Sequence, residues 1–160
     1  MSKLYFLRHG VAYTPDDWKG DNDELRPLTE EGIAAMKREA KYMRDDLKLK
    51  VDRVIASPLV RAHDTARYVA KALKLDMDES KLLKPGFDLQ ALDELLGKSD
   101  DDSNIMIVGH EPDFSRTISQ LIGGGDVIMR KGGLARVDIQ SRKPLRGELV
   151  WLLTPALMDA

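Results

Sequence analysis

Two histidines and two arginines in this chain are of the types that bind and attack tetrahedral oxyanions. His9 directly follows Arg8, whereas Arg61 and His110 lie much farther along the sequence. Guanidinium groups bind phosphate oxygens through paired hydrogen bonds, and a neutral imidazole is a nucleophile near neutral pH. The chain has only 3 histidines, so two of them in such similar sequence surroundings predict a shared anion site.

Those surroundings are short apolar runs that end just before the polar residues. The runs occupy residues 4–7, 54–56 and 105–108, and none alternates between apolar and polar positions. Such runs are typical of strands that are covered on both faces of a parallel sheet. Ligands of open α/β sheets bind outside the carboxyl ends of the strands. We therefore expect the four side chains to meet at one edge of a sheet.

Helical patterns separate these strands. Apolar residues recur every three or four positions within residues 33–47, 66–73 and 114–122. Residues 135–139 alternate apolar and polar side chains, and the apolar run 149–153 follows, which indicates an antiparallel hairpin. Together these patterns predict an α/β fold, a three-layer αβα sandwich with a mostly parallel central sheet and an antiparallel edge, as a single domain over residues 1–160.

Two of the polar groups also stand where helices should begin. Ser57 offers an N-cap and Pro58 suits the first helical position, which would place Arg61 about one turn into the helix. Pro112 likewise suits the first turn of the next helix and would place His110 at its entrance. Because helix amino termini attract phosphate, both sites favour an anion ligand.

The composition limits location and partners. Lysine and arginine number 25 against 27 acidic residues, so no overall field favours nucleic acid or an anionic membrane as a partner. There is no cysteine, which excludes disulfides and thiolate ligands and suits a reducing compartment. The amino terminus has only four consecutive apolar residues before a charge, too few for a signal or a membrane span. We expect a cytoplasmic protein of undetermined oligomeric state.

The sequence resembles the histidine phosphatase superfamily, which contains phosphoglycerate mutases and many small phosphatases. The matching motifs are Arg8-His9-Gly10, the segment 57–62 with Thr65-Ala66, and Gly109-His110. The short length and the segments 25–32 and 108–112 are most similar to SixA-type phosphohistidine phosphatases. The resemblance spans essentially the whole chain and implies the same α/β fold.

The resemblance also implies roles for the four residues. His9 would be the catalytic nucleophile and form a phosphohistidine that water hydrolyses. Arg8, Arg61 and His110 would be catalytic too, because they would bind the phosphoryl oxygens in the transition state. Nearby cations should keep His9 unprotonated, whereas a bound phosphoryl dianion should favour protonated His110. This difference predicts a bell-shaped pH dependence of kcat/KM. The resemblance also implies that the reaction uses no metal and no cofactor.

The substrate is less constrained by the sequence. Many relatives place a carboxylate after the second helix to protonate the leaving group, but this chain has Lys84 there and only Asp88 as a nearby acid. A phosphoramidate depends less on such a donor, which favours protein phosphohistidine as the substrate. The alternatives are a small-molecule phosphomonoesterase or mutase of the same superfamily, and a non-catalytic phosphate-binding regulatory module.

Other polar residues have structural interpretations. His63 is expected on a helix surface, and Arg26 on the surface of its loop, although that arginine could reach over the pocket. Thr29 is expected to cap a helix, and the three glycines at 123–125 to end one. These residues are not needed for the expected chemistry.

Overall fold

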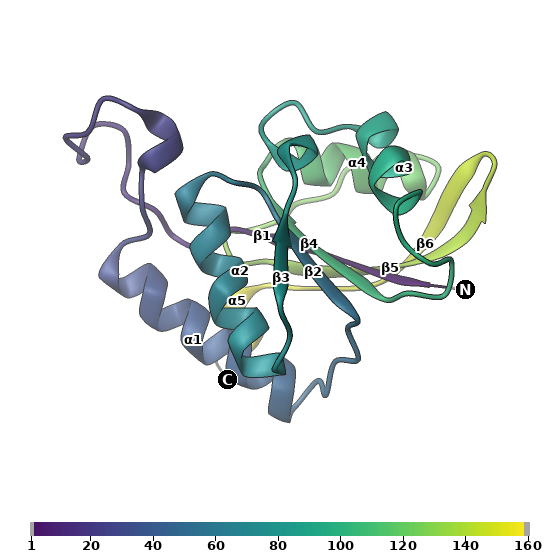
Figure 1. Cartoon of the computed structure of the whole chain (residues 1–160), viewed down its shortest axis with the longest axis horizontal. Coiled ribbons are helices and arrows are strands. Elements are labelled where there is room, and N and C mark those ends of the chain that lie inside the picture. The colour runs from purple at the N-terminus through teal and green to yellow at the C-terminus, as the bar shows by residue number, and fades with distance from the viewer. Residues whose placement is uncertain (1, 159–160) are drawn as a thin grey trace.

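Residues 2–158, which the computed structural model describes, form a six-stranded sheet in the order β3-β2-β4-β1-β5-β6 (Figure 1). β1 pairs in parallel with β4, and β2 pairs in parallel with β3 and β4. β5 runs antiparallel to β1 and to β6. The strands are β1 (Lys3–Arg8), β2 (Arg53–Ala56), β3 (Met77–Glu79), β4 (Ile105–Gly109), β5 (Leu134–Arg142) and β6 (Leu145–Leu153). The mostly parallel sheet with an antiparallel edge is confirmed.

Helices cover both faces of this sheet. Figure 1 shows α1, α2 and α5 on one side and α3 and α4 on the other. The helices are α1 (Glu30–Asp45), α2 (Val60–Leu73), α3 (Leu89–Leu96), α4 (Asp113–Leu121) and α5 (Pro155–Met158), with the short 3₁₀ helices η1 (Asp23–Leu25) and η2 (Lys81–Leu83). Among the described residues, no helix is both long and apolar enough to cross a bilayer.

Strand β1 illustrates why the central strands lack polar alternation. Leu4 and Phe6 belong to the apolar cluster that includes α3 and α4, whereas Tyr5 and Leu7 belong to the cluster that includes α1 and α2. Successive side chains of a strand point to opposite faces, so a strand between two helical layers must be apolar on both. The two clusters establish the three-layer αβα sandwich that the sequence predicts.

Some boundaries differ from the sequence prediction. α2 begins at Val60 with Leu59 as its N-cap, so Arg61 is the second helical residue and does not lie a turn inside. α4 begins at Asp113 with Pro112 as its N-cap. Thr29 caps α1 as expected, because its side chain accepts a hydrogen bond from the Gly32 amide at 2.9 Å. Arg61 therefore lies in the first turn of α2.

Besides the short α5, η1 and η2, the sequence patterns did not predict β3 and α3. β3 is a three-residue edge strand with exposed acidic residues, and it therefore lacks the apolar run by which the buried strands were recognised. α3 is only 8 residues long, which leaves little room for a periodic pattern. Its N-cap is Asp88, whose side chain accepts a hydrogen bond from the Ala91 amide at 2.9 Å.

Candidate active site

The carboxyl ends of β1, β2 and β4 lie side by side and bring the four predicted residues together. Arg8 pairs with Gly109 across the sheet, and Ala56 pairs with Val108. Residues at these strand ends and in the first turn of α2 line a common cavity of about 290 Å³ at this edge of the sheet. Its lining includes all four predicted side chains, Arg8, His9, Arg61 and His110. The convergence expected from strand ends is therefore present in the structure.

The His9 ring is held with one nitrogen engaged and the other available. Its Nδ1 lies 2.7 Å from the carbonyl oxygen of Gly10, and since a carbonyl only accepts, Nδ1 carries the proton that it donates. The lone pair of the neutral ring is then on Nε2. The Gly10 amide donates to Thr65 Oγ1 at 3.1 Å, which ties this turn to α2. The arrangement leaves the lone pair of Nε2 facing no protein donor among the hydrogen bonds of the described residues.

Both histidines are neutral at physiological pH. The pKa of His9 is lowered to about 3, first by burial and then, against the opposing hydrogen bond to Gly10, by neighbouring cationic groups. The pKa of His110 is lowered to about 4, again mainly by burial and then by the nearby Arg61. Burial disfavours the imidazolium because a low-dielectric surrounding solvates charge poorly. His9 is therefore available as a base or nucleophile at pH 7, as the sequence predicts.

The low pKa of His110 corrects the expected pH profile. kcat/KM reports the pKa values of the free enzyme, and in the free protein neither histidine titrates between pH 5 and 8. The bell-shaped dependence expected from the sequence is therefore not expected for this pair in that range. A protonated His110 is confined to a state with a bound phosphoryl dianion, whose charge would raise the pKa again.

Ser57 orients His110. The Ser57 hydroxyl lies 2.8 Å from His110 Nε2 and accepts from the Leu59 amide at 3.3 Å. The hydroxyl proton can then be donated to Nε2, which places the proton of neutral His110 on Nδ1. That Nδ1 is buried and has no hydrogen-bond partner among residues 2–158, so it can donate to a ligand oxygen. The rings of His9 and His110 lie 5.4 Å apart, between their centroids.

The two arginines are held by different parts of the chain. Arg8 Nη1 donates to the Met129 carbonyl oxygen at 2.9 Å, and its Nε is buried without a partner in the described part of the chain. Arg61 Nη1 donates to the Asp23 carbonyl oxygen at 2.9 Å, and Nη2 donates to the Asp23 carboxylate at 3.2 Å. Asp23 lies in η1, within the loop that projects above α2 (Figure 1). Asp23 was not predicted to lie at the site, because nothing in the sequence distinguishes it within a polar loop.

The sequence profile of the histidine phosphatase superfamily (branch 1) matches residues 4–84, which include Arg8, His9 and Arg61. The chain belongs to this superfamily. An uncharacterized protein of Picosynechococcus sp. is 35% identical over an alignment of 156 positions, and the alignment covers 89% of this chain and 93% of that protein. Membership of a superfamily of phosphatases supports phosphatase activity and a phosphorylated substrate.

Solved structures of SixA proteins share this histidine phosphatase fold over nearly its whole length. The protein histidine phosphatase SixA complexed with tungstate has a TM-score of 0.84 at 22% identity, covering 98% of this chain and 99% of that chain. A SixA protein from Agrobacterium tumefaciens has a TM-score of 0.80 at 24% identity, covering 96% of this chain and 98% of that chain. A phosphoserine phosphatase from Entamoeba histolytica in complex with 3-phosphoglyceric acid has a TM-score of 0.71 at 16% identity, covering 96% of this chain and 98% of that chain. The fold of this histidine phosphatase is SixA-like.

Arg26 lies at this cavity, contrary to the expectation of a surface arginine. Its side chain is only 15% exposed, and its Nε donates to the Asp23 carboxylate at 2.9 Å. Its Nη1 also donates to the Tyr13 carbonyl oxygen, and Arg26 lines the cavity. The alternative that it reaches over the pocket is the one that the structure supports. The expectation failed because a sequence does not show how a loop folds back.

Asp88, the nearby acid noted in the sequence, is not at the site of this histidine phosphatase. Asp88 caps α3 and does not line the cavity, and Lys84 forms an ion pair with Glu24 at 2.7 Å. Among the described residues that line the cavity, Glu111 is the one carboxylate. Its oxygens accept from the Ser115 amide at 2.8 Å and from the Ser115 hydroxyl at 2.7 Å. Both carboxylate oxygens of Glu111 are therefore engaged by Ser115.

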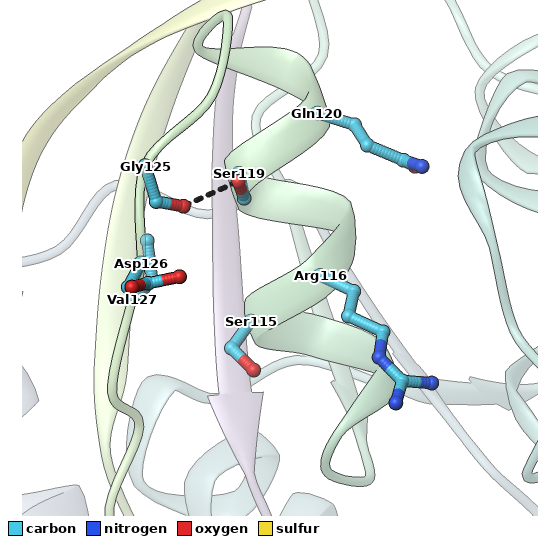
Figure 2. A pocket seen from close by; sticks show the side chains of 7 residues that line it. All are labelled: Ser115, Arg116, Ser119, Gln120, Gly125, Asp126 and Val127. Carbon is cyan, nitrogen blue, oxygen red and sulfur yellow. Dashed lines mark hydrogen bonds between the residues drawn. The ribbon is translucent and has the colours of Figure 1, made fainter.

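A second hollow, of about 340 Å³, lies beside α4 and contains none of the four residues of the candidate site. In Figure 2, two serines face the loop that carries Gly125, while Arg116 and Gln120 point to the other side of the helix. No histidine lines it, and one arginine alone does not build an oxyanion site. The hollow is lined by Ser115, Arg116, Ser119, Gln120, Gly125, Asp126 and Val127. His63 lies outside both hollows and pairs with Glu79 at 3.0 Å, half-buried on α2.

The depressed histidine pKa values predict a specific loss of stability in acid. His9 and His110 are neutral in the folded chain but are protonated in the unfolded chain below pH 6.5. Their contribution to the free energy of unfolding is complete above about pH 6.5. It is lost as the pH falls toward the folded-state pKa values, about 4 for His110 and about 3 for His9. By linkage, each of these two histidines should lower the free energy of unfolding by on the order of 2 kcal/mol at pH 5. Urea unfolding of the wild type and of His110→Asn from pH 7.5 to 5 measures this slope, which should be shallower in the variant.

Proposed function

We propose that this histidine phosphatase dephosphorylates protein phosphohistidine through a covalent phosphohistidine on His9. The observation that carries the proposal is the state of the His9 ring. Its Nδ1 is committed to the Gly10 carbonyl, so the free Nε2 belongs to a neutral imidazole in a cavity that also holds two arginines. A neutral nucleophile next to fixed cations is suited to attack an anionic phosphorus centre.

The reaction has two displacement steps at phosphorus. The lone pair of His9 Nε2 attacks phosphorus while the P–N bond to the substrate imidazole breaks, and the departing nitrogen takes up a proton. Water then cleaves the P–Nε2 bond, which restores neutral His9 and releases inorganic phosphate. Both steps pass through an in-line transition state with charge on three equatorial oxygens.

Three side chains are proposed to bind those oxygens. Arg8 and Arg61 would supply charge, and His110 Nδ1 would supply a hydrogen bond, since it is buried and unpartnered in the described structure. A charge pair at about 4 Å in an effective dielectric near 20 is worth on the order of 4 kcal/mol before desolvation. Because guanidinium groups provide this charge, we propose that the enzyme needs no metal, and activity should persist in EDTA.

The preference for phosphohistidine rests on the leaving group. An alkoxide leaving group needs a positioned acid, and the one carboxylate described in the cavity lining is bound by Ser115. The nitrogen of phosphohistidine is basic enough to be protonated from solvent. The fold shared with a protein histidine phosphatase is consistent with this preference, whereas the fold shared with a phosphoserine phosphatase favours the small-molecule alternative.

A competition assay distinguishes these substrates. The purified protein is given a phosphohistidine peptide together with phosphoserine and 3-phosphoglycerate, and the release of phosphate from each is followed. We expect kcat/KM for the phosphohistidine peptide to exceed the other two by at least about 100-fold. An equal or greater kcat/KM for a small ester would replace the proposal with a small-molecule phosphomonoesterase. Binding of phosphate without turnover of any substrate would indicate a regulatory module.

A further inference from the structure

The outer faces of α1 and α2 concentrate positive charge in a chain that is otherwise acidic. The two helices lie side by side on the same face of the sheet (Figure 1). Residues 35–50 and 65–75 hold nine lysines and arginines against three acidic residues, whereas the remaining chain holds sixteen against twenty-four. Charge separated so strongly in a protein of net charge −2 creates a local positive field.

This charge lines a cleft of about 630 Å³ between the two helices, which we call the basic groove. Its exposed cations are Lys37, Lys41, Arg44, Arg67 and Lys71. A neighbouring hollow of about 510 Å³ shares Arg44 and adds Lys48, Lys50 and Lys74. The cationic surface therefore continues beyond the basic groove toward the carboxyl ends of both helices.

Carboxylates compensate little of this charge. None lines the basic groove among the described residues. Arg44 pairs with its neighbour Asp45 at 2.7 Å, and Arg67 lies 3.7 Å from Asp64. Lys48, Lys71 and Lys74 have no ion pair in the described part of the chain. Like charges on adjacent helical turns repel one another and destabilise the free protein, so an anionic partner would relieve this repulsion.

We propose that the basic groove docks an acidic segment of the phosphoprotein substrate; this proposal rests on the proposed function. α2 connects the two sites, because it carries Arg61 at its start and Arg67 six residues later. At 1.5 Å per residue, Arg67 lies about 9 Å along the helix from Arg61, and Lys74 about 20 Å from it. An extended acidic segment of about ten residues can span that distance from the phosphorylated residue.

A protein segment fits the basic groove better than a nucleic acid or a membrane. Both of those polyanions extend far beyond the basic groove and would meet the acidic remainder of the surface. Single strands also bind through exposed aromatic rings. The aromatic side chain that lines the basic groove, Tyr68, already has Lys37 at 5.5 Å and Arg67 at 4.9 Å from its ring centre. A short acidic segment can bind within the basic groove without meeting that acidic surface.

Two matched substrates test the docking. One phosphohistidine peptide carries a tail of about ten glutamates, and the other carries a tail of about ten glutamines. At low salt we expect kcat/KM to be about tenfold higher for the acidic peptide, with the difference lost at high salt. The double variant Lys41→Glu/Lys71→Glu should remove the difference. The matched control Lys98→Glu/Lys143→Glu changes the net charge equally, away from the basic groove, and should retain it.

The outcomes separate docking from catalysis. Turnover of an aryl phosphate, which is too small to reach the basic groove, reports the proposed function by itself, and anisotropy of the labelled acidic tail reports docking by itself. No preference for the acidic peptide in an active wild type, or equal loss in both double variants, would overturn the docking proposal. The docking proposal would also be overturned if phosphatidylserine vesicles or a single-stranded oligonucleotide bound as tightly as the acidic tail or more tightly, and if the Lys41→Glu/Lys71→Glu variant abolished that binding.

Discussion

Replacement of His9 by asparagine is expected to lower kcat/KM for an aryl phosphate by at least about 10⁴-fold. The structure offers no second nucleophile in that position, because His110 Nε2 is engaged by the Ser57 hydroxyl. Steady-state turnover measures the loss. Rapid quenching with a labelled substrate should also trap an acid-labile, alkali-stable phosphoryl adduct in the wild type and none in the variant.

The same substitution should have the opposite effect on stability in acid. Asparagine does not titrate, so the variant escapes the penalty that a buried His9 with a pKa of about 3 imposes below pH 6.5. Relative to the wild type, we expect the variant to lose less stability on acidification, by on the order of 2 kcal/mol in the free energy of unfolding between pH 7.5 and pH 5.

A His9→Asn variant that retained turnover and the trapped adduct would show that His9 is not the nucleophile.

Replacement of Arg61 by alanine is expected to lower kcat/KM by about 10²- to 10³-fold. Two consequences combine. The substitution removes a buried guanidinium from the cavity, and it also removes one of the two arginine partners of the Asp23 carboxylate, which lies 3.2 Å from Arg61 and is bound by Arg26 at 2.9 Å. Most of the loss should appear in kcat, because charge develops on the phosphoryl oxygens in the transition state.

Two control variants separate these consequences. Arg61→Lys keeps the charge but loses the planar fork that can bind two oxygens, so it should recover only part of the activity. Asp23→Asn keeps the carbonyl acceptor of Arg61 and removes the carboxylate, so it should lower KM modestly for an anionic substrate. If Arg61→Ala matched the wild type in kcat/KM for an aryl phosphate, Arg61 would have no part in transition-state binding.

The elements that the sequence predicted are those with strong local signals. Residues 4–7 and 105–108 were recognised because strands buried on both faces must be apolar throughout. β3 and α3 were missed because an exposed edge strand and a short helix carry weak patterns. Arg26 was placed on the surface because its position depends on how its loop folds, and loop composition says little about that.

The sequence by itself determined which residues could form the phosphoryl site. Arg8, His9, Arg61 and His110 each follow a strand or a strand–helix turn, and the carboxyl ends of parallel strands must share an edge. Only the tertiary structure decided their chemical state. Whether His9 is neutral depends on burial and on the Gly10 carbonyl, and the position of Arg61 depends on Asp23, which lies 38 residues away in the chain. Burial and contacts between distant residues arise from packing, which sequence patterns do not encode locally.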